Sequence, residues 1–130
     1  MPAATNADDR TRLAALRGAT TVDDDTRDAI KDRVVELLCH LVEHNHVDHD
    51  DVVSILFTAT DDLHAMFPAE AARGIGYGDV PLICARELDI AGATARCVRV
   101  LLHIETTRPR TDLHHVYLHG ARGLRDDLPE

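Results

Sequence analysis

The sequence predicts an α+β fold, in which a mixed sheet of about five strands packs on one long helix. Two observations predict this class. Apolar residues recur at helical spacing between residues 26 and 44, which indicates an amphipathic helix. Short apolar runs rich in β-branched or alternating residues lie on both sides of it, which indicates strands. We expect one domain at residues 13–120, between a disordered leader at 1–12 and a mobile tail at 121–130.

The first half of the chain is expected to give a strand, a helix and a second strand. Residues 13–21 should form a strand that breaks at Gly18. The acidic run 23–25 followed by Thr26 is a helix start signal, because acidic residues favour the positive end of the helix dipole and Asp or Thr can cap it. The apolar run 51–58 then predicts a buried strand, so the three elements suggest a βαβ unit with a right-handed crossover.

The second half is predicted to alternate shorter elements. Pro68 suits the first position of a second, short helix, and Gly74 suits its end. A third strand is expected at residues 80–85. Residues 97–105 show the clearest strand pattern, because two different sets of side chains alternate along them. A short fifth strand is expected at residues 115–119.

Composition excludes several classes of function. The net charge of −9, with no basic stripe, argues against nucleic-acid binding. No apolar run approaches membrane-spanning length, and no signal peptide is visible at the start. The three cysteines are odd in number and lack CxxC spacing, which favours a reducing compartment over a disulfide framework. We therefore expect a soluble, cytoplasmic protein.

The residues that could carry chemistry gather in and around residues 83–99. Glu87 and Arg99 place a carboxylate and a guanidinium at the ends of two apolar segments. Spacing alone fits either a site or a structural ion pair. Cys84 has no neighbouring histidine to activate it, so a small buried residue is the better interpretation. Tyr117 fits a half-buried strand position as well as a ligand contact.

A histidine cluster offers a separate possibility. His40 and His44 are spaced i and i+4 on the expected helix, as metal ligands often are, and His46 and His49 follow. No cysteine or carboxylate completes a metal motif here. Histidines near a helix C-terminus are also favoured by the dipole alone. We therefore expect no metal.

Five separated segments resemble one family, the monofunctional, trimeric chorismate mutases. These enzymes assemble as a pseudo-α/β barrel and are distinct from the all-helical class. The resemblance covers about residues 13–128, and the segments occur in the family's order. They are LRGATTV (16–22), FTATDDLHAMFPAEA (57–71), VPLICARELDI (80–90), CVRVLL (97–102) and HHVYL (114–118).

The resemblance implies a Claisen rearrangement of chorismate to prephenate, in phenylalanine and tyrosine biosynthesis. Such an intramolecular reaction needs no metal or cofactor. It needs the substrate held as a compact chair, and a fixed cation where negative charge grows on the ether oxygen. By resemblance Arg99 is that cation, and Glu87 accepts the ring hydroxyl with Cys84 beside it. Arg17 and Tyr117 match the positions that bind the side-chain carboxylate.

The resemblance also implies a homotrimer whose sites lie between adjacent subunits. The chain differs from the family's pattern at Glu70, where relatives can carry a lysine, and in the loop 74–79, which is one residue shorter than expected. A carboxylate at Glu70 would repel a dianionic substrate. The remaining matches are Leu82, Ile83, Phe67, Ala69 and Leu124 in the pocket wall and Arg73 and Arg125 at its mouth.

Three other functions stay open on the sequence. A trimeric imine deaminase-like protein would also bind a small carboxylate between subunits through an arginine. Such a protein would not need Glu87 as a hydroxyl acceptor, so Glu87 together with Arg17 favours the mutase. A regulatory module that binds a small molecule without turnover and a metal protein are the other two.

Overall fold

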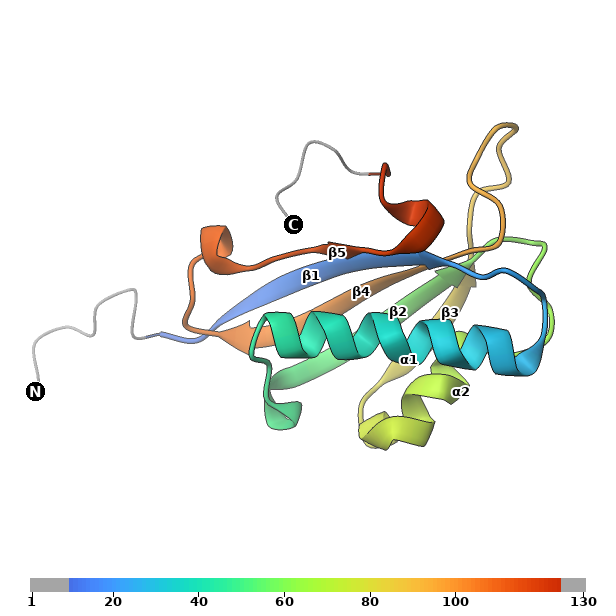
Figure 1. Ribbon diagram of the computed structural model, residues 1–130. Coiled ribbons are helices and arrows are strands. Elements are labelled where there is room, and N and C mark those ends of the chain that lie inside the picture. Colours follow the sequence, from blue (N-terminus) through green and yellow to red (C-terminus); the bar gives the residue numbers. More distant parts are fainter. Residues whose placement is uncertain (1–9, 125–130) are drawn as a thin grey trace, which may run out of the picture.

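The computed structural model describes residues 10–124, which form a five-stranded mixed sheet in the order β3-β2-β4-β1-β5. Helix α1 (Arg27–His44) covers one face of the sheet, and the short helix α2 (Pro68–Ala72) packs beside α1 (Figure 1). This architecture confirms the predicted fold class. The strands are β1 (Arg12–Thr21), β2 (Val52–Ala59), β3 (Leu82–Arg86), β4 (Cys97–Thr106) and β5 (Val116–Tyr117).

Most of the expected leader and tail lies outside the described residues, at 1–9 and 125–130. At the C-terminal end, Ala121 is fully buried and Leu124 packs against the same cluster. Within residues 10–124, no helix is both long and apolar enough to cross a membrane.

Helix α1 forms where the sequence predicts it. Thr26 caps its start, because its side-chain oxygen accepts a hydrogen bond of 3.2 Å from the backbone N–H of Ala29. Asp28 lies in the first turn, where its negative charge interacts favourably with the positive end of the helix dipole. The buried face then packs on the sheet through Ile30, Val34, Leu37, Leu38 and Leu41.

Strand β1 corrects one expectation, since it does not break at Gly18. It runs through this residue and pairs with β4 along its whole length. Gly18 lies under α1, where an added Cβ would stand 2.9 Å from Leu41 Cδ1 and 3.1 Å from Val100 Cγ1. The glycine therefore allows the helix to approach the strand closely, and the strand break expected at this residue is wrong.

The predicted βαβ unit is present in a split form. Strands β1 and β2 both pair antiparallel with β4, so they run parallel to each other with β4 between them. Strand β3 then joins β2 in parallel, and β5 joins β1 in parallel. Strand β4, which is the fourth strand in the sequence, thus lies at the centre of the sheet.

Two element ends also differ from expectation. Helix α2 begins at Pro68 as predicted but ends at Ala72, not at Gly74. The chain continues as a π-type turn (Arg73–Tyr77), in which Gly76 takes the left-handed conformation with φ 108°. Strand β5 has only two residues, because His119 adopts φ 53° and starts the 3-10 turn η5 (His119–Ala121).

The two faces of the sheet have different roles. On β4, Val98, Val100, Leu102 and Ile104 are buried in the main core that contains α1, as the alternation predicts. The intervening residues lie on the second face. Near β5 that face is covered by η5, where Ala19, Cys97, Tyr117 and Ala121 form a small buried cluster. The rest of the second face is not covered by any described element (Figure 1).

Asn45 joins the end of α1 to the segment before β5. Its side chain is fully buried. The Nδ2 group donates to the carbonyls of Leu41 and His114 at 2.9 and 2.8 Å, and Oδ1 accepts from the His114 N–H at 2.7 Å. The amide thus satisfies backbone groups that would otherwise be buried without partners.

Replacing Asn45 with Ala is expected to lower the free energy of unfolding by about 2–4 kcal/mol, because it leaves buried polar backbone groups unpaired. Urea denaturation at a fixed protein concentration measures the effect. Glu43→Ala, an exposed change in the same helical turn, should stay within about 0.5 kcal/mol of the wild type. Equal stability of the two variants would contradict this role for Asn45.

Asp25 fixes the loop that follows β2. Its Oδ1 accepts from the backbone N–H groups of His64 and Ala65 at 2.8 and 2.9 Å, and Oδ2 lies 3.2 Å from the His64 ring. The hydrogen bond from the His64 backbone is the largest influence that lowers the pKa of Asp25 below 3.8. The stabilisation is therefore complete above pH 3.8 and is lost as pH falls through the lower, folded-state pKa.

We expect Asp25→Asn to lose less thermal stability than the wild type when the pH falls below 3.8, because the amide oxygen still accepts and does not titrate. Melting temperatures recorded across this range measure the difference. Asp24→Asn is the control, since no described residue donates a hydrogen bond to the Asp24 side chain. Parallel acid profiles for the wild type and Asp25→Asn would refute the expectation.

Candidate active site

One row of residues crosses the second face of the sheet. Arg99 on β4 is paired with Ala19 on β1 and with Thr58 on β2. Ala19 is in turn paired with Tyr117 on β5. Because paired residues lie side by side on the same face, strand register alone places Tyr117, Ala19, Arg99 and Thr58 in order across four strands.

Arg99 and Glu87 meet at one end of this row. Arg99 Nε lies 3.5 Å from Glu87 Oε2, and their side chains are 38% and 20% exposed. The Glu87 backbone N–H donates to the Ala59 carbonyl at 3.0 Å, which fixes the residue just after β3. Thr58 Oγ1 donates a hydrogen bond to the same Glu87 oxygen.

The pair does not use all of the hydrogen-bonding capacity of Arg99. Arg99 Nε is buried and has no hydrogen-bond partner among the described residues. A buried donor without a partner is uncommon and is costly unless something completes it. The geometry thus differs from a closed structural ion pair, and it leaves a fixed cation available to an acceptor atom.

Arg17 and Tyr117 lie toward the β5 edge of the same face. Arg17 is half-buried on β1 opposite Leu101, two residues before Ala19. Tyr117 is buried in the small cluster with Ala19, and Leu124 packs against that cluster. Arg125, expected at the pocket mouth, lies outside the described residues.

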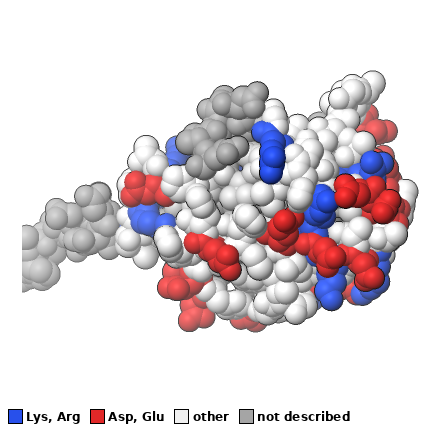
Figure 2. All heavy atoms as spheres, viewed as in Figure 1, with Lys and Arg blue, Asp and Glu red and all other residues white. Residues whose placement is uncertain are grey.

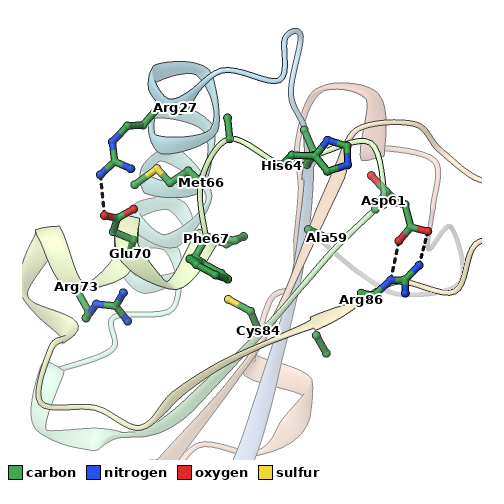
Figure 3. A pocket seen from close by; sticks show the side chains of 15 residues that line it. Arg27, Ala59, Asp61, His64, Met66, Phe67, Glu70, Arg73, Cys84 and Arg86 are labelled. Atoms are coloured by element: carbon green, nitrogen blue, oxygen red, sulfur yellow. Dashed lines mark hydrogen bonds and ion pairs between the residues drawn. The ribbon is translucent and has the colours of Figure 1, made fainter.

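A cavity of about 940 Å³ lies beside α2 and β3 and contains another group of the expected residues. Phe67, Arg73 and Cys84 line it together, and Figure 3 shows Phe67 next to Cys84. Ala69 and Leu82, expected in the pocket wall, pack into the main core instead of lining this cavity. Lining residues not predicted as site positions include Arg27, Asp61, His64, Met66, Glu70 and Arg86.

Ile83 is separated from this group. It is 63% exposed and does not line the cavity, although its neighbour Cys84 does. Adjacent strand residues point to opposite faces, and Cys84 packs against the main core. Ile83 therefore belongs to the second face, as Arg99 does.

Charges in the cavity are arranged as pairs with one exception. Arg27 binds Glu70 at 2.7 Å, and Arg86 binds Asp61 at 2.7 and 3.0 Å (Figure 3). The hydrogen bond from Arg27 lowers the pKa of Glu70, which keeps that carboxylate ionised. Arg73 makes no hydrogen bond or ion pair with residues 10–124. It is the cavity arginine best able to receive an anion.

The expected site residues therefore form two sets on different parts of the chain. Phe67, Arg73 and Cys84 line the large cavity. Of the second-face set, Arg17, Arg99 and Tyr117 line neither cavity, while Glu87 lines a smaller one of about 210 Å³ with the β3–β4 connection. One copy of the chain does not bring the two sets into a common pocket.

Sequence reasoning missed two side-chain contacts in these regions, one to the expected site residue Glu87 and one to Glu70, which was not expected to bind substrate. Thr58 supports Glu87 across 29 positions, and Arg27 holds Glu70 across 43. Both contacts depend on strand order and on helix placement. The only sequence signal for Thr58 was a polar residue in an apolar run.

The four histidines near the end of α1 do not converge. His40 is exposed, His44 lies edge-on to His114 with ring centroids 4.9 Å apart, and His49 contacts Asp79 at 2.8 Å. Across residues 10–124, no group of three or more histidine, cysteine or acidic residues is arranged to hold a metal. On the face seen in Figure 2, acidic and basic side chains are interspersed and form no continuous basic stripe.

Comparisons with known proteins agree with one another. A family model described as chorismate mutase type I matches residues 13–128. Chorismate mutase AroH of Bacillus subtilis is 42% identical over 117 residues, covering 89% of this chain and 92% of the relative. The AroH of Thermus thermophilus is 44% identical over 117 residues, covering 89% and 96%.

A solved structure extends the similarity to the fold. The chorismate mutase from Clostridium thermocellum superposes with a TM-score of 0.82 at 45% identity, covering 84% of this chain and 97% of that one. The family model, at residues 13–128, spans both helices and all five strands apart from the first residue of β1. The chain belongs to the type I chorismate mutase family, the isomerases that convert chorismate to prephenate.

Proposed function

We propose that the chain performs this rearrangement at a site shared between two subunits of a cytoplasmic homotrimer, with Arg99 as the principal catalytic cation. In the reaction an ether carbon–oxygen bond breaks while a carbon–carbon bond forms within one molecule. No proton, nucleophile or cofactor takes part. The protein must therefore hold a compact conformer and stabilise the charge that develops.

One observation carries the role of Arg99. Its buried Nε donor has no hydrogen-bond partner in the described chain, yet Glu87 and the β4 backbone fix its position. A preorganised donor of this kind stabilises an oxygen on which negative charge grows, and it loses little to reorganisation as the bond breaks. The ether oxygen is the acceptor we assign to the exposed part of this guanidinium, whose side chain is 38% exposed.

The other second-face residues suit binding and orientation. Glu87, held by Thr58, is an acceptor for the ring hydroxyl. Arg17 and Tyr117 lie farther along the same face and suit the side-chain carboxylate. Leu124 packs next to Tyr117 and would close that end of the pocket.

The second half of the site is proposed to come from the neighbouring subunit. Arg73 supplies a cation not paired with any residue of 10–124, and Phe67, which is 69% exposed, supplies an apolar wall with Cys84 beside it. These side chains belong to a different surface from Arg99. A shared site explains why one copy presents two incomplete sets.

Exposed apolar residues support the association of subunits. Ile83 lies on the uncovered second face and is 63% exposed. Leu88 and Ile90, 77% and 63% exposed, lie on the β3–β4 connection, which projects from the sheet on the side away from α1 (Figure 1). Large apolar side chains that one subunit leaves this exposed suit burial at a subunit interface.

Arg99→Ala is expected to lower kcat by at least about 10²-fold with the oligomer intact, because it removes a donor used in the transition state. An assay of the conversion of chorismate to prephenate measures kcat, and light scattering measures the oligomeric state. Arg99→Lys should recover only part of the activity, since a point charge does not reproduce the fixed guanidinium. Arg110→Ala, at an exposed position, is the control. Near-normal turnover of Arg99→Ala would exclude the proposed role.

Mixing two inactive variants tests the shared site. Arg73→Ala and Arg99→Ala subunits, unfolded together and refolded at equal amounts, should regain about a quarter of wild-type turnover. Half of the cavities keep Arg73, half of the second faces keep Arg99, and a random pairing joins both in a quarter of sites. A site within one subunit would always contain one substituted arginine, so the mixture would then stay inactive.

A further inference from the structure

His115 makes an unusual connection at the edge of the sheet. Its ring nitrogen Nδ1 accepts a hydrogen bond of 2.9 Å from the backbone N–H of Arg17, and the contact is partly buried. In a sheet, a strand N–H normally donates a hydrogen bond to a backbone carbonyl of the neighbouring strand. Here a side chain supplies the acceptor, one residue before β5 begins.

Strand β5 makes only a short backbone ladder with β1. Its pairing with β1 consists of Gly18 with Val116 and Ala19 with Tyr117. The Leu118 N–H then donates to the Ala19 carbonyl at 2.9 Å. The imidazole bond therefore adds one more connection to a very short ladder, at the end where Arg17 lies.

The backbone next to His115 is itself anchored. The buried amide of Asn45 binds both backbone groups of His114, at 2.7 and 2.8 Å. The His114 ring lies edge-on to His44 near the end of α1. His115 thus reaches β1 from a point that the helix holds in place.

The ring must be neutral to accept at Nδ1, so its proton is on Nε2. Burial, and secondarily the neighbouring His114, lowers the pKa of His115 below 6.5. At neutral pH the imidazole is therefore in the form that the contact needs.

We propose that His115 is a positioning residue for substrate binding, which sets the backbone of Arg17 and the register of Tyr117 through its acceptor at the edge of β1. The two residues that it positions lie on adjacent strands and are assigned to the same carboxylate. This inference rests on the proposed roles of Arg17 and Tyr117. It concerns a residue that contacts neither the substrate nor the reacting atoms.

Two substitutions separate the acceptor from the rest of the side chain. His115→Leu keeps bulk but removes the acceptor, and His115→Asn places an amide oxygen at the same branch position as Nδ1. We expect His115→Leu to lower kcat/KM for chorismate by on the order of ten-fold, the equivalent of one lost hydrogen bond, mainly through a higher KM. His115→Asn should recover most of the loss.

His40→Leu, at an exposed position of α1, is the matched control and should keep wild-type KM. The inference is overturned if His115→Asn is as impaired as His115→Leu, or if both bind chorismate normally. It is also overturned if His115→Leu loses melting temperature and kcat with no change in KM, which would be a purely structural effect.

Arg17→Ala, assayed in parallel, separates this inference from the assignment on which it rests. A raised KM in Arg17→Ala with normal kinetics in His115→Leu refutes the positioning role alone. An unchanged KM in Arg17→Ala refutes the assignment of Arg17 itself.

Discussion

The close packing of α1 on the middle of the sheet is the constraint on which the rest of the structure depends. At Gly18 the helix approaches so closely that an added Cβ would lie 2.9 Å from a Leu41 methyl group. Because of this packing, one face of every central strand is buried in the core. The same packing leaves the other face for Arg99 and the residues aligned with it, so this half of the candidate site lies on the face that the helix does not cover.

Strand register determines which side chains lie next to one another on the uncovered face. Arg99 stands between Ala19 and Thr58 because β4 lies between β1 and β2 in a fixed alignment. A slip of one residue would turn Arg99 into the core and put Val98 or Val100 on the outer face. The pairing of β4 with two neighbours over most of its length opposes such a slip, and the apolar residues beneath α1 oppose it further.

The sequence predicted the elements that have strong local signals. The helix at 26–44 and the strand at 97–105 have clear periodicity, and both were found with their ends within a residue. The predicted strand break at Gly18 was wrong, because the sequence alone does not distinguish a glycine that permits close packing from one that interrupts a strand. The expected strand at 115–119 was too long, since nothing local shows that His119 takes a positive φ.

The candidate site was predictable in its residue types but not in its arrangement. Family resemblance pointed to Arg99 and Glu87, and the structure places them 3.5 Å apart. Their catalytic roles stay predictions, as do those of Arg17, Tyr117 and Arg73. Thr58 and His115 could not have been predicted, because their contacts join residues 29 and 98 positions apart through strand order. The division of the expected residues between two surfaces is likewise a property of three-dimensional packing.

The small cluster over β5 has a consequence for thiol chemistry. Cys97 is 1% exposed beneath Ala121, and burial raises the pKa of its thiol, so it is shielded from alkylating reagents. Cys84 lines the large cavity and is open to small reagents that enter there. Two of the three thiols of the chain thus differ in accessibility, and one lies near each set of site residues. In a variant whose third cysteine, Cys39, is replaced, labelling of Cys84 would attach a spectroscopic probe to the cavity while leaving the strand that bears Arg99 unmodified.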